Sequence, residues 1–416
     1  MTIVQPTILQ VLPALDMGGV ERGTIEMAIA IQKAGARPIV ASEGGRLVPR
    51  LQRLNITHVT LPLSRKSPLA IWRNRRALTA LIRKEKVDLI HARSRAPSWA
   101  ALGAAKKCKI PFVTTWHGVH KSGFPGKKRY NSVLTRGDRV IAISDYIARR
   151  MRQEFKIGDD RLRTIYRGVD VARFDPDQFL GQRVQNLAIR FDLPPDAKII
   201  LMPGRLTRWK GQLLLVEALA KLKSALPWKC VFVGPAEPTS PFVKELESRI
   251  HAHGLQEKIR FVGTQDDMPA VYAMADVVVV PSLRPEPFGR VIIEAQAMGC
   301  PVIVSGQGGA VETVLDEQTG LVIPPNDRTA LAQAIDVLLD IDADSRAYIR
   351  TTARQNVMQH YTMTLMQSQT LAVYDELLHT ELAPMLLQSL MTPEETWPPR
   401  RASSAPLSSL AATSMP

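Results

Sequence analysis

Cysteine is scarce in this sequence. The 416 residues contain three, Cys108, Cys230 and Cys300, and no two of them stand in a Cys-x-x-Cys pair. This spacing excludes a disulfide framework and a cysteine-based zinc cluster. Because unpaired cysteine is among the residues most often buried, we expect three small core side chains and no redox chemistry.

Long apolar segments are absent as well. No run approaches the roughly 18 residues that a transmembrane helix requires. Residues 1–15 have no basic stretch ahead of an apolar one, so they predict a first β-strand rather than a signal peptide. With 45% hydrophobic and 22% charged residues, the composition is that of a globular protein. We therefore expect a cytoplasmic protein of two large domains, since one domain typically takes about 150 residues.

Two sequence motifs with known chemistry are missing. Neither the G-x-G-x-x-G of dinucleotide-binding enzymes nor the H-E-x-x-H of zinc enzymes occurs. D-x-D patterns do occur, at Asp175 and Asp177 and again at Asp340, Asp342 and Asp344. Both lie in linker or helix-end contexts, so we expect them to be charged surface. The sequence predicts no metal site and no resident cofactor.

Negative charge is sparse in the first part of the chain. Residues 1–180 carry 33 Lys and Arg against 14 Asp and Glu, a net charge of +19, whereas the remainder carries −4. The excess gathers at Arg73, Arg75 and Arg76 beside Trp72, at 106–109, and at 127–129. Such a face attracts anionic lipid headgroups, phosphorylated acceptors or nucleic acid, although each cluster alone is typical of a solvated surface. No interleaved aromatic residues support nucleic-acid binding.

Short β-type runs alternate with helix-length segments as far as residue 340, which predicts an α/β protein with parallel sheets. In the first half, the predicted strands are Ile8–Leu12, Pro38–Ala41, His58–Leu61, Leu89–Ala92, Phe112–Thr115 and Val140–Ile143. In the second half, they are Ile199–Met202, Cys230–Val233, Ile259–Val262, Val277–Val280, Val302–Ser305 and Leu321–Ile323. Two Rossmann-like, doubly wound domains facing a central cleft follow from this order.

Proline-rich breaks in the alternation place the domain boundary within 170–195. We expect a first domain at 1–175 and a second at 176–360, with a helix at 361–382 that crosses back to the first domain. Residues 383–416 are rich in Pro, Ser and Met and predict a disordered tail. Because ligands of open α/β sheets bind beyond the carboxyl ends of the strands, the loops there should face the cleft.

In the first domain, two such loops have candidate binding residues. Gly18 and Gly19 follow the first strand and precede a helix predicted from Thr24, so their backbone could approach an anion at a helix N-terminus. His117 follows the strand Phe112–Thr115, where a histidine is either structural or catalytic. A tight Gly-Gly turn is the alternative interpretation of the first loop.

In the second domain, the loop after Ile199–Met202 contains Arg205 and Lys210 between two glycines, and a helix predicted from Leu213 follows. Two cations in a strand-to-helix loop suit a diphosphate. The loop after Val277–Val280 contains Glu286 and enters a helix near Arg290, with Glu294 one turn inside it. These two carboxylates could bind sugar and ribose hydroxyls while the helix N-terminus faces phosphate.

Taken together, these segments resemble the family 4 retaining glycosyltransferases of GT-B fold over residues 8–378. The Gly204-Arg205 and Lys210-Gly211 pairs resemble that family's diphosphate motif, and Glu286 to Glu294 its Glu, seven residues, Glu signature. Gly18-Gly19 and His117-Gly118 resemble its donor-side elements. The linker Ile165–Asp170 is also similar, with Arg167 where Asn is usual.

This resemblance implies roles for these residues. Arg205 and Lys210 would hold the donor diphosphate, supported by backbone amides of Phe288, Gly289, Arg290 and Val291. Glu294 would bind the ribose, Glu286 the transferred sugar, and His117 would act with Glu286 in catalysis. The implied reaction retains anomeric configuration, with attack on the face from which the nucleotide leaves and without metal. Double displacement with Glu286 as nucleophile is the alternative.

The excess of positive charge in residues 1–180 also suggests where the acceptor lies. We expect a peripheral enzyme at the inner membrane face that moves a sugar from a nucleotide-sugar donor to a glycan or glycolipid acceptor, lipid-linked or of lipopolysaccharide type. A sugar-nucleotide epimerase of the same fold remains the nearest alternative. A nucleotide-dependent oxidoreductase is a more distant one, because fold alone does not fix function.

Overall fold

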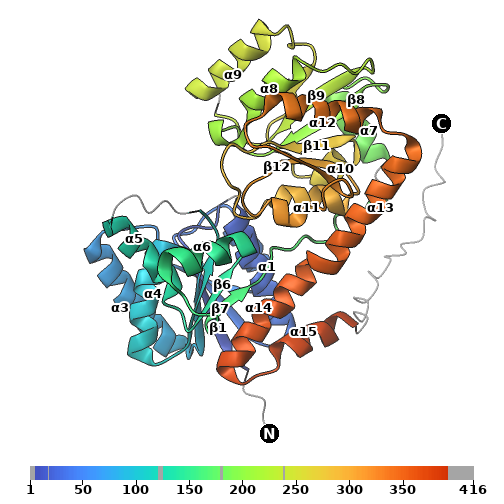
Figure 1. The fold of residues 1–416 in the computed structure, drawn as a ribbon. Helices are drawn as coiled ribbons and strands as arrows, with labels where there is room; N and C mark the ends of the chain where they lie inside the picture. Colours follow the sequence, from blue (N-terminus) through green and yellow to red (C-terminus); the bar gives the residue numbers. More distant parts are fainter. Residues whose placement is uncertain (1–4, 17, 120–124, 179–180, 238, 392–416) are drawn as a thin grey trace, which may run out of the picture.

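The computed structural model describes residues 5–16, 18–119, 125–178, 181–237 and 239–391. Two α/β domains lie one above the other, each built on its own parallel sheet (Figure 1).

The first sheet has seven parallel strands in the order β3-β2-β1-β4-β5-β6-β7. They are β1 (Thr7–Val11), β2 (Arg37–Ser42), β3 (Thr57–Thr60), β4 (Leu89–Ala92), β5 (Phe112–Trp116), β6 (Arg139–Ala142) and β7 (Leu162–Thr164). The six predicted strands are confirmed to within one residue. The seventh was missed because its three residues, Leu-Arg-Thr, give no apolar run.

The second sheet has six parallel strands in the order β10-β9-β8-β11-β12-β13. They are β8 (Lys198–Pro203), β9 (Trp228–Val233), β10 (Ile259–Phe261), β11 (Val277–Val280), β12 (Val302–Ser305) and β13 (Gly320–Ile323). All six were predicted. In both sheets the strand order reverses once, between β1 and β4 and between β8 and β11, and ligands of doubly wound sheets bind beside such reversals.

Helices cover both sheets. Those of the first half are α1 (Gly19–Lys33), α2 (Val48–Arg53), α3 (Pro68–Glu85), α4 (Arg95–Cys108), α5 (Pro125–Asn131) and α6 (Asp145–Phe155). Those of the second half are α7 (Gly181–Arg190), α8 (Gln212–Leu219), α9 (Pro241–Ala252), α10 (Met268–Ala273), α11 (Arg290–Ala297) and α12 (Arg328–Asp340). Helix α1 begins five residues before the predicted Thr24, because Gly18 already takes the extended conformation of an N-cap residue and Glu21 favours the first turn.

The chain returns from the second domain to the first through two long helices. Helix α13 (Ala343–His360) packs on α11 of the second domain, and α14 (Met363–Leu378) follows it down one side of the molecule (Figure 1). Met366, Leu371 and Tyr374 of α14 are buried in one apolar cluster with Ile8 of β1 and Ile31 of α1. The first domain therefore contains core residues from the far end of the sequence.

The predicted disordered tail was placed too early. Residues 382–391 form a helix, α15 (Leu382–Met391), which buries Leu382, Ala383 and Leu386. The Asp375 carboxylate accepts hydrogen bonds from the backbone N–H of Leu382 at 2.8 Å and of Ala383 at 2.9 Å, which satisfies the helix N-terminus. The rest of the predicted tail, 392–416, lies outside the described residues.

Two chain segments join the domains, and they pair with each other. The N–H of Val169 donates to the Tyr361 carbonyl at 2.9 Å, and the N–H of Met363 donates to the Val169 carbonyl at 2.8 Å. A Cβ on Gly168 would lie 2.5 Å from the Thr362 carbonyl oxygen, so only glycine allows this approach. The paired crossing segments form the hinge between the domains. Within the described residues, no helix combines the length and apolar character that crossing a bilayer requires.

Candidate active site

The loop after β11 holds Glu286 in an ion pair. Lys210 Nζ donates to Glu286 Oε1 at 2.6 Å, and the Ser282 hydroxyl donates to the same oxygen at 2.6 Å. The Glu286 side chain is 7% exposed and that of Lys210 17%. Lys210 ends the short 3₁₀ helix η2 (Arg208–Lys210), and its ammonium lies 4.4 Å from the centre of the Trp209 ring. Two residues predicted for the site, 76 positions apart in sequence, are thus in direct contact.

Glycines allow neighbouring loops to approach the Glu286 loop. Gly211 has φ +90°, and a Cβ there would lie 2.1 Å from the Pro281 carbonyl oxygen. Gly308 has φ +76°, and its Cβ would lie 2.5 Å from the Glu286 carbonyl oxygen, which accepts from the N–H of Gly309 at 2.7 Å. Larger residues at these two positions would push the loops apart.

Arg205 lies just beyond the carboxyl end of β8. Its backbone carbonyl accepts from Gln212 Nε2 at 3.1 Å, which fixes the loop. The side chain is exposed and makes no hydrogen bond or ion pair with any residue that the structure describes. The Arg205 guanidinium is therefore available to an anion at this edge of the sheet.

Helix α11 starts beside this loop and presents Glu294. Its N-cap, Gly289, has φ +100°, a conformation that favours glycine. Phe288 is buried against the rings of Tyr166 and Tyr361 and so anchors the helix start. The amides of the first helical turn, including those of Arg290 and Val291, have no acceptor one turn earlier in the helix and can bind phosphate.

The Glu294 carboxylate is buried between two polar groups. The Tyr272 hydroxyl donates to Oε2 at 3.2 Å, and Arg290 Nε lies 3.7 Å from Oε1. Burial raises the pKa of Glu294, and the positive charge of Arg290 opposes that shift. Burial also raises the pKa of the Tyr272 hydroxyl, which remains a donor. Glu294 is thus placed to accept hydrogen bonds from a diol.

Three further residues predicted for the site lie in the first domain. Gly18 is the N-cap of α1 and Gly19 its first residue, and a Cβ on Gly19 would meet nothing within 4 Å. The backbone at Gly19 therefore faces open space, as a ligand-binding loop requires. His117 follows β5 and is half-buried. These residues lie at the carboxyl ends of β1 and β5.

A pocket of about 530 Å³ lies between the domains beside Glu286. Its lining combines Val119 and Arg150 of the first domain with Trp209, Arg284, Pro285 and Pro287 of the second. The two prolines flank Glu286 in sequence, so the pocket lies beside the loop that holds the candidate catalytic residue. Its apolar walls and its two arginines distinguish it from the loops described above.

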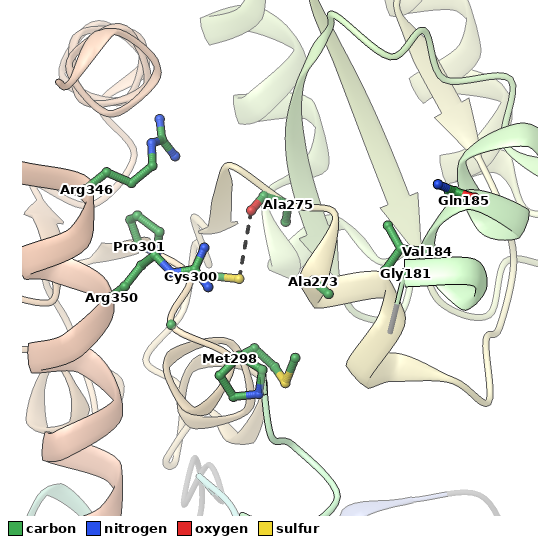
Figure 2. Close-up of a pocket in the computed structure, with 12 residues that line it drawn as sticks. Gly181, Val184, Gln185, Ala273, Ala275, Met298, Cys300, Pro301, Arg346 and Arg350 are labelled. Carbon is green, nitrogen blue, oxygen red and sulfur yellow. Dashed lines mark hydrogen bonds between the residues drawn. The ribbon is translucent and has the colours of Figure 1, made fainter. Parts of the chain in front are cut away.

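Another pocket, of about 390 Å³, lies in the second domain between α7 and α13 (Figure 2). Arg346 and Arg350 project toward it from α13, and Val184 and Gln185 of α7 lie opposite. Cys300 lines it and donates to the Ala275 carbonyl at 3.9 Å. Burial raises the pKa of this thiol to about 12, so it is not a nucleophile at neutral pH. Cys230 is buried as predicted, whereas Cys108 is partly exposed.

Comparisons with known proteins agree with this architecture. The family described as "Glycosyl transferases group 1" matches residues 185–356, and the family described as "Glycosyltransferase Family 4" matches residues 17–173. A crystal structure of a glycosyltransferase from Rickettsia africae is 39% identical in sequence, with a TM-score of 0.85 over 91% of this chain and 100% of that one. This chain belongs to the group 1 glycosyltransferases, of the family 4 type.

Two further proteins are similar to this group 1 glycosyltransferase. The D-inositol 3-phosphate glycosyltransferase of Jonesia denitrificans is 29% identical over 306 residues, which are 69% of this chain and 71% of that protein. The Anabaena protein HepE, solved in complex with UDP and glucose, has a TM-score of 0.77 at 24% identity over 90% of this chain and 100% of that one. The second likeness shows the GT-B fold, in agreement with the fold predicted from the sequence.

Several residues of this candidate site were not predicted from the sequence. Gly308 and Gly309 follow β12 as Gly18 and Gly19 follow β1, so the strand-Gly-Gly pattern could have indicated them. Ser282 had no signal, because a serine four residues before a glutamate is common. Glu26 and the side chain of Arg290 were also missed, since their contact joins residues 264 positions apart.

Three aspartates of the D-x-D patterns make structural contacts. Asp175 Oδ1 accepts from Arg354 Nη2 at 2.8 Å, Asp340 accepts from the Ser224 hydroxyl at 2.9 Å, and Asp342 caps α13. Among the described residues, no three His, Cys, Asp or Glu side chains are grouped so that they could hold a metal ion.

Proposed function

We propose that this glycosyltransferase moves a hexosyl group from a nucleoside-diphosphate sugar to a membrane-associated acceptor, with retention of configuration and without a metal ion. The observation that supports this most is the convergence of four side chains at the carboxyl edge of the second sheet. Lys210 and Glu286 are in contact there, Arg205 is free of described partners, and Glu294 lies in the adjoining helix.

Positive groups at this edge are suited to the departing diphosphate. The Arg205 guanidinium and the Lys210 ammonium supply full charges, and the first turn of α11 supplies backbone N–H groups. Fixed positive groups aimed at developing negative charge stabilise a transition state as a divalent cation would. These groups are therefore sufficient for the nucleoside diphosphate to leave without a metal ion.

The surroundings of Glu286 favour same-face attack over double displacement. Oε1 of Glu286 accepts two hydrogen bonds of 2.6 Å, from Lys210 and Ser282. Because the two carboxylate oxygens share one negative charge, these bonds lower the nucleophilicity of the whole group and hold it in place. In this proposal, Glu286 orients the transferred sugar, and the leaving phosphate oxygen takes the acceptor proton.

The pocket between the domains is suited to the acceptor. Trp209 and the two prolines that flank Glu286 give it an apolar wall on which a sugar ring can stack. Arg150 and Arg284 give it positive charge for an anionic group on the acceptor. An amphipathic, anionic glycan acceptor fits these walls better than a neutral soluble sugar does.

The surface of α3 supports membrane association. Leu69 is 57% exposed and Trp72 is 47% exposed, and the Arg76 guanidinium lies 4.5 Å from the centre of the Trp72 ring. Arg73 and Arg75 lie on the same helix. An exposed tryptophan among arginines is the combination that interfacial helices use, and each basic residue contributes about 1 kcal/mol near an anionic surface.

Donor binding is tested by thermal shift with UDP, GDP and ADP and their sugar conjugates, because a ligand of the native state raises the midpoint. Transfer is then followed with and without EDTA, and the anomeric configuration of the product is determined by NMR. Loss of activity in EDTA, restored by Mn²⁺ or Mg²⁺, would refute the metal-free mechanism. A change of the donor sugar without any acceptor would instead support the epimerase.

Membrane association is tested by co-sedimentation with anionic and neutral vesicles across a salt series. Substituting Arg73, Arg75 and Arg76 with Glu should reduce binding to anionic vesicles and leave nucleotide affinity unchanged. Substituting Lys106, Lys107 and Lys109 with Glu makes the same change in charge at the C-terminal end of α4, and is the matched control for the change in net charge alone. Equal loss in both variants, or equal binding of the wild type to both vesicle types, would leave a soluble acceptor as the better proposal.

A further inference from the structure

A row of charged side chains runs from the Gly18-Gly19 loop of the first domain to Glu294 of the second. Arg167 Nη2, from the hinge, donates to the Gly19 carbonyl at 3.1 Å and lies 3.8 Å from Glu26 Oε2. Glu26 Oε1 accepts from Arg290 Nη2 at 3.1 Å across the domain boundary. Arg290 Nε in turn lies 3.7 Å from Glu294 Oε1.

These side chains are largely removed from water. The exposed fractions are 7% for Arg167, 14% for Glu26, 21% for Arg290 and 11% for Glu294. Burial lowers the pKa of Arg167 to about 9, with the charge of Arg290 adding to the effect and that of Glu26 opposing it. At Arg290 the carboxylates of Glu26 and Glu294 outweigh burial and raise the pKa. Both guanidinium groups therefore depend on Glu26 for their charge balance.

The packing around Arg167 shows that helix α1 leaves room for this row of charged side chains. A Cβ on Gly23 would lie 2.1 Å from Arg167 Nη2 and 2.9 Å from its Cζ. Gly23 thus leaves a slot in α1 through which the arginine reaches the carbonyl of Gly19. Gln367 of α14 donates to the Glu26 carbonyl at 2.8 Å and fixes that part of α1 from the other side.

The contact across the boundary is only partly made. Glu26 Oε2 and Arg290 Nη1 are both buried, and neither has a hydrogen-bond partner among the described residues. A guanidinium and a carboxylate can form two parallel bonds, and this pair forms one. Leaving a buried charged donor or acceptor unsatisfied is costly. A small further approach of the domains would let the second bond form.

We infer that Glu26, Arg167 and Arg290 are positioning residues that make ribose recognition by Glu294 depend on the approach of the two domains. This inference rests on the proposed function, in which Glu294 binds the donor ribose. Arg290 lies beside the carboxylate of Glu294, and its positive charge favours the ionised form. Glu26 holds Arg290 only when the domains are together, and Arg167 ties the same glutamate to the Gly18-Gly19 loop.

The test measures how strongly the full-length protein prefers ribose over a sugar without the diol. Calorimetry gives the affinities for UDP and for 2′,3′-dideoxy-UDP, with the GDP and ADP pairs in parallel. Hydrogen bonds to a charged group predict that the wild type prefers the ribonucleotide by about ten- to a hundredfold. Glu294→Gln should abolish most of that preference.

The decisive variant is Glu26→Gln, because Glu26 lies in the other domain and is not expected to touch the nucleotide. We expect Glu26→Gln and Arg290→Met each to reduce the ribose preference about fivefold or more, and Glu26→Gln to change affinity for the dideoxynucleotide by less than about twofold. Arg290→Lys keeps a charge without the planar fork and should recover part of the preference. Glu85→Gln, which breaks the Arg37–Glu85 pair of 3.0 Å within the first domain, is the matched control and should change neither affinity.

The outcomes separate the inference from the function on which it rests. If none of the three ribonucleotides binds the wild type, or if Glu294→Gln keeps the full preference, the proposed donor site is wrong and the inference fails with it. If Glu294→Gln loses the preference but Glu26→Gln and Arg290→Met retain it, the donor site stands and the charged row is only an interdomain contact. Equal loss of affinity for both nucleotides in those variants would likewise indicate a general structural role and refute the inference.

Discussion

Replacing Lys210 with methionine should destabilise the second domain even in the absence of nucleotide. The substitution keeps the apolar stem of the side chain over Trp209 and removes the ammonium that pairs with Glu286. Glu286 would then be a carboxylate with 7% of its side chain exposed and one remaining side-chain donor, the Ser282 hydroxyl. A buried charge without its counterion is the source of the expected loss.

The expected loss of stability is the cost of breaking a buried ion pair, reduced by two features of this site. Removing one partner of a buried ion pair costs about 3–5 kcal/mol. The partial exposure of Lys210 and the bond from Ser282 reduce this, so we expect about 2–3 kcal/mol. For a domain of this size, that corresponds to a fall in Tm of about 4–12 °C.

The assay is thermal unfolding of the ligand-free protein, followed by circular dichroism and calorimetry. Adding Glu286→Gln to Lys210→Met should recover most of the loss, because an uncharged amide needs no counterion. Arg208→Met is the matched control. Arg208 lies in the same loop as Lys210, and its pair with Glu245 of α9 is exposed to water, so this substitution should leave Tm nearly unchanged. A loss below about 1 kcal/mol in Lys210→Met, or no recovery in the double variant, would refute this account of the pair.

Arg205→Ala should weaken nucleoside-diphosphate binding by about 1.5–3 kcal/mol, and an unchanged affinity by calorimetry would remove this residue from the site. Because the pKa of Glu294 is raised, its contribution to folding is complete below the ordinary carboxyl pKa and is lost as the pH rises through the raised value. Its ionised form is the one that accepts from the diol, so nucleotide affinity should fall as the pH drops through that raised value; a calorimetric series in which Glu294→Gln shows the same fall would contradict this. Gly211→Ala should cost about 1–3 kcal/mol and more than Gly254→Ala, since both have positive φ but only the first places a Cβ against Pro281; equal denaturation midpoints would count against a role for that contact.

The strands could be predicted because of where they lie. A strand buried on both faces by flanking helices is a short apolar run, as Val277–Val280 is. Strand β7 at the sheet edge gives no such run, because its Arg163 pairs with Glu376 of α14 at 2.8 Å instead of packing in the core. The start of α15 escaped prediction for a similar reason, since the Asp375 carboxylate that caps it lies in the preceding helix.

The candidate site could be predicted only in part. Glu286, Lys210 and Glu294 follow strands, and the local pattern together with the family resemblance was enough to name them. The contact of Lys210 with Glu286 depends on the pairing of β8 with β11, which brings their two loops together. The bond between Arg290 and Glu26 depends on how two separately folded sheets dock, and no local pattern contains that information. The sequence therefore predicted Arg290 for its backbone amide and not for its side chain.

The return of α14 to the first domain has a consequence for synthesis. During translation, β1 to β7 leave the ribosome long before Tyr374, whose hydroxyl lies 2.6 Å from His91 Nδ1 in the interior of that domain. The strands of the second domain are all present by Ile323, so it can acquire its whole sheet while the earlier-made half still lacks part of its core. The half that is made first is thus completed last, and a nascent chain that stops at His360 would have an unfinished apolar surface for chaperones to cover.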